Sequence, residues 1–280
     1  MTLSNSEVKK LESSKAYKAC LTALIKEDRY LECDEAGRDV LFYLIKKGNC
    51  KEATHLMQKA QQDGKLDKLL DFDKEATNSQ SNRTRVHQMV FYRRVDLLQY
   101  FVENFDIKFQ EQINKAEDMH HLEAPIYSLV YNLKQQETIE TLEFLLENGA
   151  HITSNSRNKF LHQLAANASS DVFDQFIEKI KEKLSTNDFE AILNAQDRNC
   201  TNNQEDQNVY RGRTPIFYAI FAENTANVKT LMKCGSSLKV TDEINKTPEF
   251  WLTCSPSTLV QFPKLTQRLL PKSEQLVANS

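Results

Sequence analysis

Apolar residues along this chain fall three and four positions apart, in short runs that come in pairs. Residues 214–222 and 227–234 form the clearest pair, separated by a polar interruption. Thr214 can accept a hydrogen bond from a free backbone N–H at a helix start, and Pro215 suits the first helical position, which needs no N–H partner. Gly235 is typical of the residue just past a helix C-terminus. The pattern predicts a short helix, a turn and a second helix.

The same unit recurs along the chain at irregular intervals. A further copy begins at Thr247, 33 residues after Thr214 (247 − 214). First helices are predicted to begin near Asp39, Thr84, Ala124, Lys159 and Thr214, with a partial copy at Thr247. The surplus residues between copies fall in polar stretches such as 63–82 and 197–209, which predict loops. Helices this short are not stable alone in water, so the copies are expected to stack.

The best copy, residues 211–242, contains T-P-I-F-Y-A and L-M-K-C-G-S-S and ends at an Asp, and the segment 193–197 reads L-N-A-Q-D. These motifs resemble ankyrin repeats, whose signature T-P-L-H-x-A recurs about every 33 residues. The resemblance implies an all-α fold: an α-solenoid of about five to six divergent ankyrin-like helix-turn-helix repeats with helical caps. Residues 1–33 would form an N-terminal helical cap or decayed repeat, 34–254 the array, and 255–280 a C-terminal capping helix and polar tail.

The resemblance also implies where a partner would bind. Ankyrin repeats usually contact their partners along the concave surface, through the residue before the Thr position and through the outward side of the first helix. The positions of this chain that match are Arg38, Lys46, Lys47, Arg83, Phe91, Tyr92, Tyr131, Arg213 and Phe221. Arg together with Tyr and Phe is typical of interface hot spots. The expected partner is a protein or peptide with acidic and apolar residues. Alternatively, the aromatic residues merely fill gaps in irregular repeats.

The composition narrows the remaining classes of function. Lys and Arg number 36 and Asp and Glu 39, so the basic stripe of a nucleic-acid binder is not expected, and neither is a membrane surface as partner. No apolar run approaches the roughly 20 residues that span a bilayer. Six scattered cysteines without a C-x-x-C pair are typical of reduced thiols, which favours a cytoplasmic location. A monomer without cofactor or metal is expected.

The candidate catalytic and metal-binding residues are few. His87 and His162 stand at the His position of the repeat, where by resemblance the imidazole bonds neighbouring backbone. The segment Asp118–His121 offers too few converging ligands for a metal. No G-x-S-x-G, Walker loop or H-E-x-x-H is present, so we expect no enzyme.

Two other hypotheses stay open. One is an enzyme or modifying factor with a site in a non-repeat insertion or at a reactive cysteine, Cys33 or Cys254. The other is an effector that acts in the cytosol of a host cell, because divergent repeats rich in Lys, Asn and Gln resemble those that intracellular bacteria export.

Overall fold

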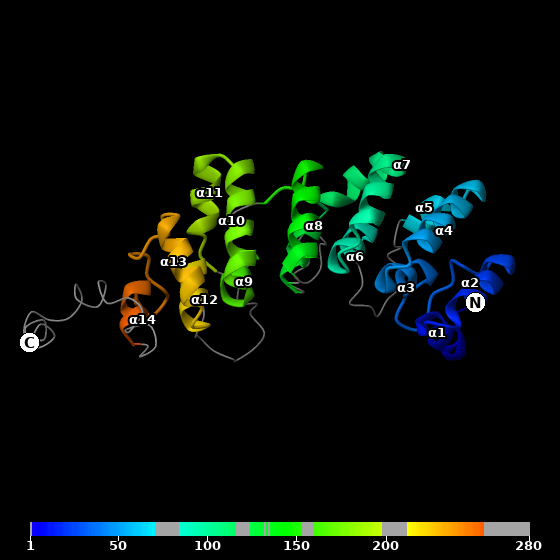
Figure 1. The fold of residues 1–280 in the computed structure, drawn as a ribbon, viewed down its shortest axis with the longest axis horizontal. Helices are drawn as coiled ribbons and strands as arrows, with labels where there is room; N and C mark the ends of the chain where they lie inside the picture. The colour runs from blue at the N-terminus through cyan, green and yellow to red at the C-terminus, as the bar shows by residue number, and fades with distance from the viewer. Residues whose placement is uncertain are drawn as a thin grey trace, which may run out of the picture. The chain divides into compact units, whose positions relative to one another are not determined.

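The computed structural model describes residues 2–70, 84–115, 124–131, 133, 135–152, 160–197 and 212–254. Within these ranges every regular element is a helix (Figure 1). One isolated antiparallel bridge joins Asp197 to Arg213. The predicted all-α class is therefore confirmed for the described residues. The chain divides into two compact units, Met1–His151 and Ile152–Ser280, and each is described by itself. The predicted C-terminal cap and tail, residues 255–280, lie outside the described residues.

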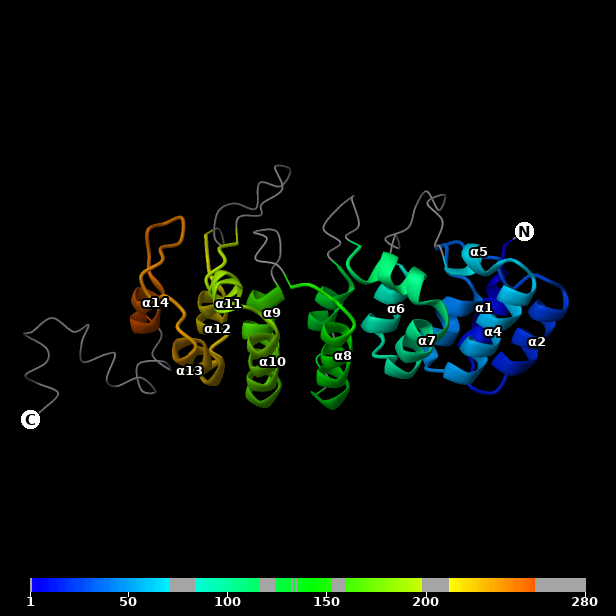
Figure 2. The same cartoon turned by 90° about the horizontal axis from the view of Figure 1, so that it is seen from above.

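Unit 1 is built from pairs of helices. Its elements are α1 (Asn5–Glu12), α2 (Tyr17–Lys26), α3 (Val40–Lys47), α4 (Cys50–Gln62), α5 (Leu66–Leu70), α6 (Arg85–Phe91), α7 (Val95–Ile113), the 3₁₀ helix η1 (Pro125–Tyr131) and α8 (Gln135–Glu147). The first helix of each pair packs against its second, α3 on α4, α6 on α7 and η1 on α8. The first helices also pack on one another, α3 on α6 and α6 on η1 (Figure 2). A shared core therefore runs along unit 1.

Unit 2 repeats this construction. Its elements are α9 (Phe160–Asn167), α10 (Ser170–Lys183), α11 (Thr186–Leu193), α12 (Pro215–Phe221), α13 (Thr225–Lys233) and α14 (Pro248–Cys254). Here α12 packs between α9 and α14 as first helices, and α10 packs against α13 as second helices (Figure 1).

The first helices begin where the sequence pattern predicts. Asp39 and Thr84 are N-cap residues, and their side-chain oxygens accept hydrogen bonds from the first turns of α3 and α6. Thr214 is also an N-cap residue, but its hydroxyl makes no capping bond, so this prediction was wrong in its detail. In α6, the Thr84 hydroxyl lies 2.8 Å from Nδ1 of His87. Phe217 holds the matching position in α12, and its N–H donates to the Thr214 carbonyl oxygen.

Two helices were not predicted. Helix α5 lies inside the stretch 63–82 that reads as a polar loop, and its Leu69 and Leu70 are fully buried. Helix α11 follows α10 and buries Phe189, Ile192 and Leu193. These helices account for part of the surplus length between copies. Each packs against the second helix that precedes it, α5 on α4 and α11 on α10.

The loop before the first helix has the same hydrogen bonds in three copies. An Asp donates its N–H to the carbonyl oxygen of the residue before the helix cap, and its own carbonyl accepts from a residue with positive φ. The Asp carboxylate then accepts a bond from an aromatic side chain of the helix, as from Tyr43, Tyr218 or Trp251. The three acids are Asp34, Asp197 and Asp242. An Asp suits this place because its side chain bonds nearby backbone in a turn.

Two buried histidines, His87 and His162, bond a helix-cap side chain and a loop backbone, respectively. The His87 ring bonds the Thr84 hydroxyl, and Nε2 of His162 lies 2.9 Å from the Arg213 carbonyl oxygen. His162 therefore bonds the loop that leads into the next first helix, as the ankyrin resemblance implies. Both side chains are almost fully buried.

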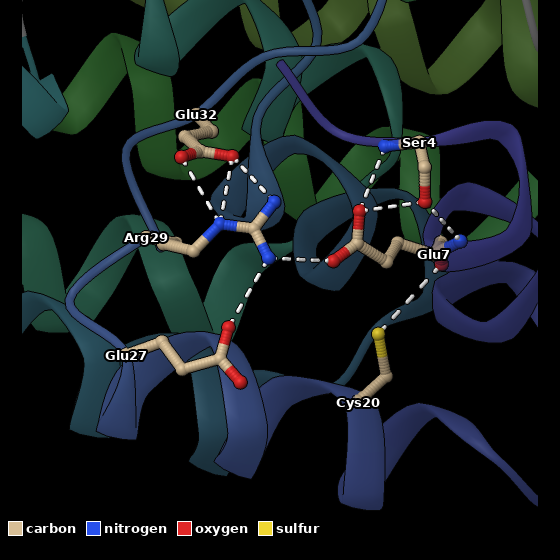
Figure 3. A network of polar contacts seen from close by, with 6 residues as sticks. All are labelled: Ser4, Glu7, Cys20, Glu27, Arg29 and Glu32. Carbon is tan, nitrogen blue, oxygen red and sulfur yellow. Dashed lines mark hydrogen bonds and ion pairs between the residues drawn. The ribbon is translucent and has the colours of Figure 1, made fainter. Parts of the chain in front are cut away.

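Helix α1 is fixed at the N-terminal end of unit 1 by a polar network (Figure 3). The Ser4 N–H and hydroxyl each donate to Oε2 of Glu7 at 2.7 Å, and the Glu7 N–H donates to the Ser4 hydroxyl oxygen, so that the two residues cap α1. Arg29, in the loop after α2, pairs with Glu7 at 2.9 Å, with Glu27 at 3.1 Å and with Glu32 at 2.8 Å. These contacts and the buried Leu11 of α1 tie it to α2 and α3.

Candidate functional site

Four aromatic rings from the first helices of unit 1 form a continuous series of contacts, which we call the aromatic row. The rings of Phe42 and Tyr92 are 6.1 Å apart between centroids, those of Tyr92 and Phe91 5.0 Å, and those of Phe91 and Tyr131 6.4 Å. The row therefore passes from α3 over the end of α6 to the end of η1. Edge-to-face and tilted pairs at these distances are favourable aromatic geometries.

The aromatic row is only partly covered. The Tyr131 residue is 60% exposed, and Phe42, Phe91 and Tyr92 are half-buried. Each ring thus contacts a neighbour on one side and solvent on another. Large aromatic residues left in this condition supply contact area at a low cost in conformational entropy when a partner binds.

Basic side chains flank the row on α3 and in the loop before it. Lys46 lies four residues after Phe42 and so shares its helix face. The Arg38 guanidinium carbon lies 5.8 Å from the centre of the Phe42 ring and 5.6 Å from that of Tyr43. Cations over aromatic faces are attracted by the ring quadrupole. The apolar surface of the row therefore has a positively charged edge.

The two cations of this edge have different intramolecular partners. Arg38 pairs at 2.8 Å with Asp34, whose side chain is only 7% exposed. Burial acts to raise the pKa of Asp34, but the hydrogen bonds from Tyr43 and Arg38 outweigh it and hold the pKa below its usual value. Lys46 pairs at 2.9 Å with Glu12 at the end of α1, and both of these side chains are well exposed. The Arg38 pair is part of the fold, while the Lys46 pair lies at the rim.

Lys47 points toward α1 and α2. Its ammonium donates to the Glu12 carbonyl oxygen and lies 5.8 Å from the centre of the Tyr17 ring. The structure therefore brings Arg38, Lys46, Phe91, Tyr92 and Tyr131 of the predicted set to the row, with Lys47 beside it. Arg83 lies outside the described residues.

The prediction that Arg213 is exposed to a partner was wrong. Its side chain is 2% exposed and lies 3.6 Å from Asp242. The guanidinium carbon is 4.2 Å from the centre of the Phe221 ring and 5.7 Å from that of Trp251. The loop before α12 turns this side chain inward, where it links α12 to α14. Phe221 itself is partly exposed, as predicted.

Sequence reasoning missed Phe42 in unit 1 and Phe250 with Trp251 in unit 2. Phe221 contacts Trp251 at 5.1 Å between centroids, and Trp251 contacts Phe250 at 5.5 Å. Lys46 could have indicated Phe42, because residues four apart on a helix share a face. The repeat alignment considered the residue before the Thr position and positions after the Ala of the signature, and Phe42 lies between them.

The thiols give little support to a nucleophilic site. Burial raises the pKa of Cys33 to about 11 and also raises the pKa values of Cys20, Cys50 and Cys234. A raised pKa lowers the fraction of the reactive thiolate at neutral pH. Cys254 is exposed at the end of α14.

No group of three His, Cys, Asp or Glu side chains in the described ranges could hold a metal ion. The Asp118–His121 segment is not among the described residues. In the part of the chain that the structure describes, none of the helices combines the length and the hydropathy needed to span a bilayer.

No protein-family model matches the chain, and no curated protein matches it.

Proposed function

We propose that this chain is a non-catalytic protein-protein interaction module, built as an ankyrin-like α-solenoid, that binds a protein or peptide segment through the aromatic row of unit 1. The observation that carries the proposal is the half-exposed row itself, flanked by Arg38 and Lys46. The partner segment would place apolar residues against the rings and an acidic residue at the basic edge.

The repeated local geometry supports the ankyrin-like assignment. Paired helices recur, and the turn inside a pair uses one residue with positive φ, Gly48, Arg93 or Glu223 in three copies. The loop before the first helix is closed by the same bonds at Asp34, Asp197 and Asp242. Repeats built this way contact mainly their neighbours and offer an extended surface.

The scaffold around the row supports binding with little rearrangement. Arg93 donates hydrogen bonds to the carbonyl oxygens of Val90 at 2.5 Å, Phe91 at 3.1 Å and Leu129 at 2.7 Å. Burial lowers the pKa of Arg93 to about 10, which leaves it protonated at neutral pH. These bonds fix the end of α6 against η1 and so fix the rings. A preorganised surface loses less entropy on binding.

The proposal includes a reducing compartment, such as a cytoplasm, because the five cysteines within the described ranges are free thiols. Action in the cytosol of a host cell is compatible with it.

The test begins with random peptides selected on the wild-type chain alone, whose affinities are then measured on the triple variant Phe91→Ala, Tyr92→Ala, Tyr131→Ala. Removing these rings is expected to weaken the selected peptides about tenfold or more, since a hot-spot side chain contributes about 2 kcal/mol. Ile107→Ala is the matched control, because this residue is 77% exposed on α7 and lies outside the row. It should leave the affinity unchanged.

Unfolding measurements separate binding from packing. The triple variant should lose little of its free energy of unfolding. Leu231 is fully buried in α13, so Leu231→Ala should lose about 2–5 kcal/mol. If the triple variant bound the peptides as tightly as the wild type, the row would not be the binding surface. A loss of stability as large as that of Leu231→Ala would mean that the rings fill gaps in the fold.

A further inference from the structure

The C-terminal end of α1 lies against the basic edge of the aromatic row. Oε1 of Glu12 is 2.9 Å from the Lys46 ammonium, and the Glu12 carbonyl oxygen accepts a bond from Lys47. The hydrogen bond from Lys46 is the main cause of a lowered pKa at Glu12. The side chains of Lys46 and Glu12 are 39% and 44% exposed, so solvent reaches both partners. This ion pair can open without disturbing the core.

The backbone of α1 is held independently of the Glu12 side chain. Leu3 and Leu11 are buried, and Glu7 is fixed by Ser4 and Arg29 (Figure 3). Rotation of the Glu12 side chain would therefore free Lys46 while α1 stays in place.

Arg38 does not offer the same opportunity. Its partner Asp34 is buried, and one carboxylate oxygen of Asp34 accepts the N–H groups of Ala36 and Arg38 while the other accepts the Tyr43 hydroxyl. An incoming carboxylate cannot replace Asp34 without breaking the loop before α3. Lys46 is therefore the cation of this edge that is open to exchange.

We infer that Glu12 is an intramolecular competitor for the acidic residue of the partner, and that a carboxylate of the partner replaces it at Lys46 when the segment binds the row. This inference rests on the proposed function and gives it a specific chemistry at one position. One carboxylate replaces another at the rim, so the exchange adds selectivity for acidic segments and little affinity. Removal of Glu12 should then tighten the binding of an acidic segment, an unusual result for loss of an ion pair.

The experiment uses two fluorescent peptides, one of Glu-Leu-Gly repeats and one of Gln-Leu-Gly repeats. Glu12→Gln should tighten the Glu peptide about two- to fivefold, the range for one exposed ion pair, and leave the Gln peptide unchanged. Asp28→Asn is the matched control, because Asp28 forms an exposed pair with Lys65 and the substitution removes the same charge. Adding Lys46→Ala to Glu12→Gln should abolish the gain, and high salt should reduce it.

Three outcomes would overturn the inference: an unchanged affinity in Glu12→Gln, an equal gain in Asp28→Asn, or no binding of the Glu peptide to Glu12→Gln. If, in these cases, the triple variant of the row still binds the peptides selected on the wild type more weakly than the wild type does, the proposed function stands and only the role of Glu12 is wrong. If the triple variant binds the selected peptides as tightly as the wild type does, the proposed function fails.

Discussion

Removal of the Asp39 carboxylate tests how the first helices of unit 1 are held together. Asp39 accepts the Phe42 N–H at 2.9 Å as the cap of α3, and it also pairs with Arg85 of α6. Both charged side chains are almost fully buried. Arg85 also donates to the Leu69 carbonyl and to Gln88, each at 2.9 Å. These two acceptors are neutral, so neither replaces the charge of the carboxylate when it is removed.

The expected cost follows from these contacts. Breaking one partner of a buried ion pair costs about 3–5 kcal/mol, and the remaining acceptors of Arg85 place Asp39→Asn near the lower limit, about 3 kcal/mol. Asparagine can still cap a helix, but alanine cannot, so Asp39→Ala should lose about 1 kcal/mol more. Arg85→Met added to Asp39→Asn removes the charge that has lost this carboxylate and should recover part of the loss.

The assay must follow unit 1. The single tryptophan, Trp251, lies in unit 2, so its fluorescence does not report unit 1 directly. Chemical denaturation followed by far-UV circular dichroism, with amide exchange of α3 and α6, is suitable. The reasoning would be refuted by a loss below about 1 kcal/mol in both Asp39→Asn and Asp39→Ala. It would also be refuted if the double variant lost the sum of the losses of Asp39→Asn alone and Arg85→Met alone.

Three further predictions follow from local features. The pKa of Glu7 is lowered from 4.5, chiefly because its carboxylate accepts the Ser4 N–H. Protection of the α1 amides from exchange should therefore be full above pH 4.5 and should fall as the pH drops through the lowered pKa. In Glu7→Gln the protection should change little with pH. Glu223 has φ of 54°, so Glu223→Gly should raise the denaturation midpoint by relieving strain of about 1 kcal/mol, and an unchanged or lower midpoint would contradict this. Cys33 should alkylate far more slowly than Cys254 at neutral pH, measured by mass spectrometry, because burial raises its pKa; equal rates would exclude the described burial.

The helix pairs could be predicted because their signals are local. A capping residue before an apolar run, as at Asp39 and Thr84, determines where a helix begins, and a glycine such as Gly48 or Gly235 marks where one ends. Arg93 and Glu223 adopt the same left-handed conformation without any glycine, so these turns have no sequence signal of that kind. The short apolar run of α5 was obscured by the polar residues around it.

The site could be predicted in part. Tyr92 and Tyr131 were identified as surface residues from their positions in the repeat, and both lie on the aromatic row. Arg213 was placed wrongly, because its burial depends on Asp242, which is distant in sequence. The pair of Glu12 with Lys46 likewise joins distant segments. Contacts of this kind depend on how helices pack, and no local pattern specifies them.

The closed loop before α3, α12 and α14 makes the spacing between helix pairs adjustable. The same backbone bonds join positions four residues apart (38 − 34) and sixteen apart (213 − 197). Closing a flexible loop of four times the length costs only about 1.2 kcal/mol more. The Asp34 loop should therefore accept an inserted epitope or reporter peptide after Glu35 while the helices on either side keep their places.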